Sequence, residues 1–217
     1  MAAGTRLWAA IRAEGGDLRN MSWNGNASFD EQTQHILLKF LQEKQVENRA
    51  YQQEIQKLEN ELRRGSRFDD DIQTDGHCPS GPLREAYNLN VEEVNPADEE
   101  LYRIIAAHLA EMGDRLDQSI NRDLVEEFIH ETERTQPQED RSFILSSMIT
   151  RLTNQRIDVT QDMPQEKVIL LLALMLFKKT VVEKPLLLPH IFRTTVQYIS
   201  RRLQQYIQSL GGWQNID

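Results

Sequence analysis

The ten residues VILLLALMLF, at positions 168–177, decide the fold of this 217-residue chain. They stand between Lys167 and the pair Lys178-Lys179, and they contain no polar residue. A run of this length falls below the ~18–20 apolar residues of an ordinary membrane span, and it suits a helix buried on all sides. We expect the segment to form the centre of a helical domain, although snorkelling lysines at its ends would also allow a marginal membrane association.

The segments on both sides of this run also have helical periodicity. Pro164 is expected to start the central helix, and Pro185 or Pro189 a second long one that ends at Gly211-Gly212. Because Pro189 would remove a hydrogen bond and clash with the preceding turn in a helix that began at Pro185, the second helix is expected to start near Leu188. Its apolar residues recur on one face: Phe192, Val196, Ile199, Leu203, Ile207 and Leu210.

Further helices are expected upstream, in 31–63 and 143–152, after a cap at Asn95 with Pro96, and from a cap at Asn121 to about Glu133. No alternating strand pattern occurs in the sequence, so the predicted fold is all-α. Residues 64–100 are rich in Gly, Pro, Asp and Glu and lack a sustained period, which is typical of a long mobile loop. The predicted organisation is one globular domain: a disordered tail at 1–30, N-terminal helices at 31–63, a regulatory loop at 64–100 and a C-terminal helical part at 101–217.

Composition excludes several classes of function. The net charge of −9 argues against nucleic acid as the main partner, and the single cysteine, Cys78, excludes an internal disulfide and agrees with a reducing compartment. The five histidines lie in separate segments without an HExxH pair, and no glycine-rich phosphate loop is present. We therefore predict that the protein is not an enzyme and needs no metal and no cofactor.

One part of the acidic chain is basic. Residues 167–217 hold seven lysines and arginines but two acids. These bases could lie on solvated helix faces, or they could be attracted to an anionic membrane surface. The predicted membrane-facing basic rim consists of Lys178, Lys179, Lys184, Arg201 and Arg202.

The stretch LYRIIAAHLAEMGDRLD, residues 101–117, has the pattern of a helix that docks into another protein's groove. Its apolar anchors recur at i, i+4, i+7 and i+11, namely Ile105, Leu109, Met112 and Leu116. Gly113 would permit close approach of a second helix, and Asp114 could pair with a partner's Arg. The spacing alone also fits a helix face that packs into the protein's own core, since Tyr51, Ile55, Leu58 and Leu62 share it. The Gly113-Asp114 pair distinguishes the 101–117 stretch from that second stripe.

The pattern L-x-x-x-(apolar)-G-D-x-(apolar)-D, which ends at Asp117, resembles the third homology motif (BH3) of the Bcl-2 family of apoptosis regulators. The predicted groove-contacting residues are Ile105, Leu109, Met112, Gly113, Asp114, Leu116 and Asp117. The resemblance covers about 101–210 and includes EKVILLLALMLFKK at 166–179, FRTTVQYI at 192–199 and YIQSL at 206–210, together with IQTDG at 72–76. It implies a bundle of about eight helices around a central hydrophobic hairpin, formed here by 164–180 and 186–210. The tail before Asp30 has no counterpart in this resemblance.

The resemblance also implies a function. The chain would be a pro-apoptotic BH3-only protein, cytoplasmic when intact, which an initiator caspase cuts in the loop. The C-terminal fragment would move to the mitochondrial outer membrane and promote its permeabilisation and cytochrome c release. The implied partners are pore-forming and survival-type Bcl-2 proteins, the caspase and the anionic mitochondrial lipid cardiolipin. Whether the fragment activates a pore former or neutralises a survival protein stays open.

The loop contains a matching cleavage site. Ile72-Gln73-Thr74-Asp75 followed by Gly76 places an aspartate before the scissile bond, a small residue after it and a branched apolar residue three places earlier. Polar loops are preferred sites of proteolysis. Cutting there would expose Gly76-His77-Cys78-Pro79-Ser80, which matches the G-x-x-x-S pattern of N-myristoylation at Gly76.

Two other classes of protein remain as alternatives. A multidomain survival-type Bcl-2 protein would share the bundle and the motif, but it is expected to carry an NWGR-like groove segment and a long membrane anchor. In this chain the order around the tryptophan is Gly212-Trp213-Gln214, which does not match the NWGR-like segment. An inert helical scaffold would leave both IQTDG and the Gly-Asp pair as coincidences.

Overall fold

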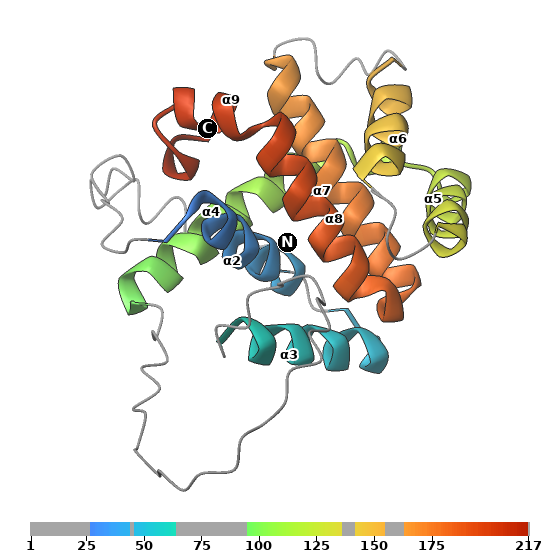
Figure 1. The fold of residues 1–217 in the computed structure, drawn as a ribbon, viewed down its shortest axis with the longest axis horizontal. Helices are drawn as coiled ribbons and strands as arrows, with labels where there is room; N and C mark the ends of the chain where they lie inside the picture. The colour runs from blue at the N-terminus through green and yellow to red at the C-terminus, as the bar shows by residue number, and fades with distance from the viewer. Residues whose placement is uncertain (1–26, 44–45, 64–94, 136–141, 155–162, 217) are drawn as a thin grey trace, which may run out of the picture.

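The computed structural model describes residues 27–43, 46–63, 95–135, 142–154 and 163–216, and every regular element in these segments is helical (Figure 1). The eight α-helices are α2 (Phe29–Gln42), α3 (Arg49–Arg63), α4 (Pro96–Asp114), α5 (Arg122–Arg134), α6 (Ser142–Asn154), α7 (Gln165–Glu183), α8 (Leu188–Arg202) and α9 (Gln204–Ser209). Short 3-10 helices follow α4, α7 and α9: η2 (Asp117–Ser119), η4 (Pro185–Leu187) and η5 (Trp213–Asn215). The predicted all-α bundle of about eight helices is confirmed.

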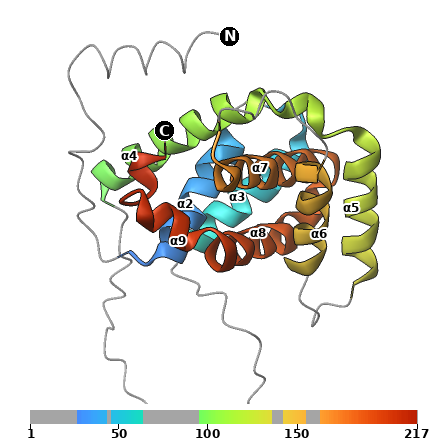
Figure 2. The same cartoon turned by 90° about the horizontal axis from the view of Figure 1, so that it is seen from above.

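The apolar run forms α7, the centre of the bundle. All of its residues from Leu170 to Phe177 are buried, and α4, α5, α6 and α8 all contact this helix. The chain turns through η4, and α8 then lies along α7 (Figure 1), while Figure 2 shows α4 and α8 on opposite sides of α7. The central hydrophobic hairpin is therefore present. Within the described segments, no helix is both long and apolar enough to cross a bilayer.

The second helix of the hairpin is shorter than predicted. It begins at Leu188 with Pro189 in its first turn, as the proline spacing indicates. It does not continue to Gly211, because the backbone at Leu203 leaves the helical region, with φ −122° and ψ −9°, and α9 starts after it. The Leu203 side chain is buried and the chain around it contains neither Gly nor Pro, so tertiary packing overrides the helical period at this residue.

The N-terminal segment forms two helices with a break between them. Ser28 begins α2 with a capping box, in which its hydroxyl accepts from the Glu31 N–H and the Glu31 carboxylate accepts from the Ser28 N–H. Asn48 precedes α3, and its side chain accepts from the N–H groups of Ala50 and Tyr51. The Tyr51 hydroxyl donates to the Leu41 carbonyl at 2.9 Å and ties the two helices together.

The C-terminal residues return to the core after two glycines. Gly211 and Gly212 have φ of +92° and +108°, a region that favours glycine, and they follow the short helix α9, whereas the long helix that they were predicted to end stops at Arg202. Trp213 then stacks on Phe29 of α2 at 5.8 Å between ring centroids, and 1% of its surface is exposed.

Candidate functional site: a buried BH3-type helix

The predicted docking motif lies in the second half of α4 and in the turn that follows it. The Asn95 side chain caps the helix by accepting from the Ala97 N–H at 3.1 Å, and Pro96 occupies the first helical position, as predicted. The exposed fractions of the four apolar anchors are small: Ile105 2%, Leu109 0%, Met112 6% and Leu116 0%. In the intact chain the stripe is therefore part of the protein's own core.

The helix that carries the stripe is covered mainly by two others. α4 packs against α2 and α7, and it also contacts η5. Gly113 faces α7, and a Cβ atom added there would lie 2.7 Å from the Met175 sulfur. The absence of a side chain at Gly113 thus allows α4 to approach the central helix closely, which is the packing reason that a glycine inside a helix requires.

Polar and aromatic contacts link the first half of α4 to α2. Lys39 of α2 donates to the Glu99 carboxylate at 2.7 Å, and this hydrogen bond holds the pKa of Glu99 below its ordinary value. His35 of α2 stacks on Tyr102 with 5.0 Å between ring centroids. Burial, with the nearby charge of Lys39, lowers the pKa of His35, so the neutral imidazole is favoured at this interface.

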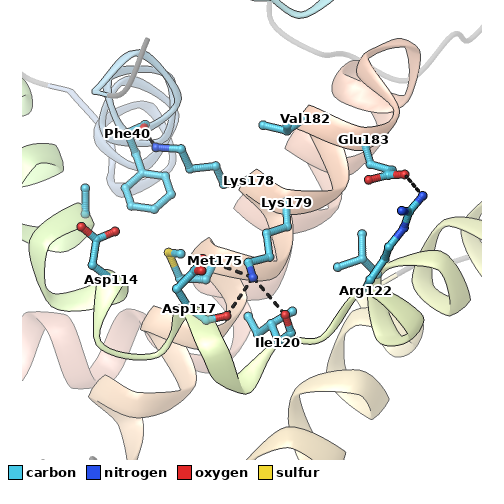
Figure 3. Close-up of a pocket in the computed structure, with 12 residues that line it drawn as sticks. Phe40, Asp114, Asp117, Ile120, Arg122, Met175, Lys178, Lys179, Val182 and Glu183 are labelled. Carbon is cyan, nitrogen blue, oxygen red and sulfur yellow. Dashed lines mark hydrogen bonds and ion pairs between the residues drawn. The ribbon is translucent and has the colours of Figure 1, made fainter. Parts of the chain in front are cut away.

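The acidic residues of the motif lie at the surface, Asp114 as the last residue of α4 and Asp117 as the first residue of η2. Asp114 is exposed, and half of the Asp117 side chain is accessible. Lys179 of α7 contacts the Asp117 carboxylate at 3.2 Å and also donates to the backbone carbonyls of Asp117 and Ile120 (Figure 3). The carboxylates predicted to meet a partner are therefore at the rim of the buried stripe.

A cavity of about 400 Å³ lies next to these residues, between α2, α4, α5 and α7. Apolar side chains and residues of both charges line it (Figure 3). Lys178 extends along it toward α2, where its ammonium lies 5.1 Å from the centre of the Phe40 ring and 3.4 Å from the Phe40 carbonyl. Lys178 is 9% exposed, so this lysine belongs to the core of the intact protein.

The five predicted rim residues therefore do not form one open surface in the intact chain. Lys178 is buried and Lys179 is held by the turn after α4. Lys184, Arg201 and Arg202 are exposed, and Lys184 contacts Glu133 at 2.7 Å. The part of the rim that is accessible before any rearrangement thus consists of these three residues.

The predicted loop sites lie outside the described residues: the cleavage site Ile72, Gln73, Thr74, Asp75 and Gly76, with Gly76 as the acyl acceptor.

The sequence did not reveal the roles of Met175 and Lys179 against α4 and the turn after it. The only feature of the sequence that points to either residue is its place within or just after the apolar run. A single sequence does not say which face of such a run meets which neighbour.

An all-helical bundle that buries a BH3-type helix against its central hairpin is a helical regulator of the Bcl-2 type. A family model described as "BH3 interacting domain (BID)" matches residues 20–212. The chain belongs to this family, and membership implies a pro-apoptotic BH3-only protein that interacts with Bcl-2 family proteins. This favours the BH3-only class over the survival-type and scaffold alternatives.

Two curated relatives agree with the family match. The BH3-interacting domain death agonist of Gallus gallus is 39% identical over 143 residues, which cover 64% of this chain and 69% of the relative. The protein of the same name from Mus musculus is 28% identical over 144 residues, 66% of this chain and 71% of that protein. The matches thus span about two thirds of each chain.

Proposed function

We propose that an initiator caspase activates this protein by cutting after Asp75, and that the C-terminal fragment then acts at mitochondria through the BH3 helix. The observation that carries the proposal is the burial of Ile105, Leu109, Met112 and Leu116 within the protein's own core. The same apolar faces cannot fill the intramolecular core and a partner's groove at the same time. Groove binding therefore requires α4 to leave its place.

The cost of that step accounts for an inactive intact form. Burying one large aliphatic side chain contributes roughly 1.5–3 kcal/mol, and the stripe buries four. When only a small fraction of a protein is in the binding-competent state, its apparent affinity for the partner is reduced by that fraction. The intact chain is therefore expected to bind a groove far more weakly than a peptide of residues 101–120.

The position of the predicted cut supports this mechanism. α2 precedes the 64–94 segment and α4 follows it, and these two helices pack directly against each other. Cutting after Asp75 would turn this intramolecular contact into one between two fragments. Without the covalent link, the effective concentration of α2 at α4 falls to that of a separate molecule, and release of α2 becomes possible by dilution or competition.

We also propose two signals that bring the cut fragment to the membrane. Myristoylation of the new N-terminal Gly76 would give marginal, reversible anchoring, so a second signal is needed. The exposed Lys184, Arg201 and Arg202 can supply it by attraction to anionic lipid such as cardiolipin, and Lys178 and Lys179 can join them once their contacts with α2 and with the turn after α4 are broken. Cytoplasmic residence before the cut and location at the mitochondrial outer membrane afterwards follow from this proposal.

The decisive experiment incubates intact and caspase-cut protein with isolated mitochondria and measures cytochrome c release. The cut protein should release cytochrome c at concentrations at which the intact protein does not. A cut protein carrying Leu109→Ala serves as the control for the BH3 helix, and it should be much less active. Equal release by intact and cut wild-type protein would contradict activation by cleavage.

A further inference from the structure

Lys179 makes three contacts with the short turn that follows the BH3 helix. Its ammonium donates to the Asp117 carbonyl at 2.8 Å and to the Ile120 carbonyl at 2.9 Å, and it lies 3.2 Å from the Asp117 carboxylate. Figure 3 shows the side chain crossing from α7 to this turn. An ammonium group has three N–H donors and no acceptor, and the turn offers one partner for each of them.

Lys179 adds donors to the backbone of this turn. The Asp117 carbonyl accepts from the Ile120 N–H at 3.4 Å and from Lys179, and the Ile120 carbonyl also accepts from Lys179. Here α4 ends at Asp114, and the chain passes through η2 before α5 starts at Arg122. Two apolar side chains of this turn, Leu116 and Ile120, are 0% and 2% exposed. Lys179 therefore fixes the polar backbone of a turn whose apolar side chains are already in the core.

We propose that Lys179 is a positioning residue that holds the C-terminal end of the BH3 helix on α7 and competes with a Bcl-2-type groove for Asp117. The inference rests on the proposed role of Asp117 in groove binding. Asp117 contacts Lys179 in the intact chain, and the same carboxylate is predicted to face the partner in the complex. Because one carboxylate cannot make both contacts at once, the Lys179–Asp117 contact must be given up when a groove engages Asp117, and its free energy is subtracted from groove binding.

The geometry predicts a local effect for the loss of this ammonium. The stem of Lys179 is partly buried on α7, with 28% of the side chain exposed, and its charged end touches residues 117 and 120. Methionine keeps an unbranched stem of similar length but has no N–H donor. Lys179→Met should therefore free the turn while leaving the packing of α7 against α6 and α8 in place.

The test measures groove binding and local opening in the full-length, uncut protein. A survival-type Bcl-2 protein is titrated into wild type and into Lys179→Met, with a peptide of residues 101–120 as the unmasked reference. Lys57→Met is the matched control, because Lys57 also forms an ion pair, at 2.6 Å with Glu54, but lies on α3. Hydrogen exchange is followed at the amides of Leu116, Ser119 and Ile120, which close this turn.

We expect Lys179→Met to bind the groove protein about tenfold more tightly than wild type and its three turn amides to exchange faster by a similar factor, since both report the same opening. Lys57→Met should match wild type in both measurements. Amides of α6, such as that of Leu152, should keep their wild-type rates in Lys179→Met. Lys179→Gln retains one donor group and should give intermediate values; it carries the same test if the methionine variant does not fold.

Two results would overturn the proposal. The first is equal groove affinity and equal turn exchange in wild type and both Lys179 variants. The second is faster exchange throughout the domain, which would make Lys179 a general stabiliser instead of a positioning residue for α4. Failure of the 101–120 peptide to bind would instead contradict the proposed groove function, so the two failures are distinguishable.

Discussion

Gly113 of α4 lies directly against Met175 of α7, so closely that a Cβ atom at Gly113 would be 2.7 Å from the Met175 sulfur. The motif predicts that the same bare backbone lets a groove approach the helix. On the proposed function, one missing side chain serves two surfaces in turn: the protein's own central helix in the intact form and a partner's groove after release. This double requirement leaves position 113 little freedom to change.

Gly113→Ala tests this relationship, because it should affect the peptide and the protein in opposite directions. Alanine favours a helix by about 1 kcal/mol over glycine, so the 101–120 peptide should become more helical by circular dichroism. In the full chain the new methyl group displaces Met175 at a cost of about 1–3 kcal/mol, which offsets the helical gain, so the free energy of unfolding should fall by up to about 2 kcal/mol. In a double-mutant cycle, Met175→Ala should relieve part of this penalty. Additive effects of the two substitutions would contradict the close contact.

Leu109→Ala should weaken both the core and the complex. The Leu109 side chain is 0% exposed in α4, so its truncation should reduce the free energy of unfolding by about 2–5 kcal/mol in urea titrations. In the 101–120 peptide the same change should weaken groove binding by a factor of roughly thirty or more, as expected at a hot spot worth ~2–4 kcal/mol. Glu111→Ala, on the exposed face of α4, is the control and should change neither quantity strongly. Undiminished binding of the Leu109→Ala peptide would show that this residue is not an anchor.

The sequence predicts the helices of this protein better than their contacts. Asn95 caps α4 and Pro189 displaces the start of α8 to Leu188, because caps and prolines act through their nearest neighbours in the chain. The ends of α2 and α8 were not predicted. Asn48 is a capping signal that could have located the start of α3, whereas the break at Leu203 has no local signal.

The same distinction applies to the functional site. The anchors of α4 follow from a 3.6-residue period, but that period does not say whether their apolar faces meet the protein's own core or a partner's groove. The contacts of Lys178 and Lys179 depend on residues that are far away in the sequence: Phe40, Asp117 and Ile120. The two lysines flank an apolar run and were therefore predicted as members of a membrane-facing rim. In the intact chain their ammonium groups bind backbone carbonyls.

Asp75→Glu should prevent activation by an initiator caspase. The longer side chain keeps the charge but moves the carboxylate away from a pocket that is specific for aspartate, so cleavage in the 64–94 segment should be abolished. Electrophoresis of the digested protein and cytochrome c release from mitochondria measure the two consequences. Asp71→Glu is the control at a neighbouring acid and should be cut normally. Full activity of Asp75→Glu after caspase treatment would point to another cleavage site.

The contact between α2 and α4 should weaken as the pH falls. Burial and Lys39 lower the pKa of His35 below its ordinary value of 6.5, so the unfolded chain binds this proton more readily than the folded one. The stabilising contribution is complete above pH 6.5 and is lost as the pH falls toward the lowered pKa of the folded state. Glu99, whose pKa Lys39 lowers from 4.5, acts in the same direction at a lower pH.

His35→Phe separates these two contributions, because phenylalanine can keep the stacking on Tyr102 but does not titrate. Between pH 7 and pH 5.5, the free energy of unfolding measured in urea should fall less in His35→Phe than in wild type. Below pH 4.5 both proteins should lose stability together as the carboxylates become protonated. Parallel curves across the upper range would mean that His35 does not contribute to the pH dependence.

The last prediction concerns the accessible part of the basic rim. Lys184, Arg201 and Arg202 are exposed, whereas Lys178 and Lys179 are engaged inside the intact molecule. Each base near an anionic surface contributes about 1 kcal/mol, and reversing a charge replaces attraction by repulsion. The triple variant Lys184→Glu/Arg201→Glu/Arg202→Glu should therefore lose most of its cosedimentation with cardiolipin-containing liposomes at low salt. Wild-type binding should itself decline steeply as salt rises, since the screening length is about 10 Å at 0.1 M ionic strength.

Net charge alone could produce the same loss, so the control reverses three other exposed bases. Arg49, Arg63 and Arg134 lie on α3 and α5, outside the helices of the hairpin, and their replacement by Glu gives a protein of the same net charge. This control should bind the anionic liposomes more strongly than the rim variant does, because the field at a bound surface depends on the charges within a screening length of it. Both variants should bind a groove protein as wild type does after caspase cleavage, since none of the six residues lies in the 101–117 motif. Equal loss of liposome binding in the two variants would show that the hairpin's bases form only a solvated surface.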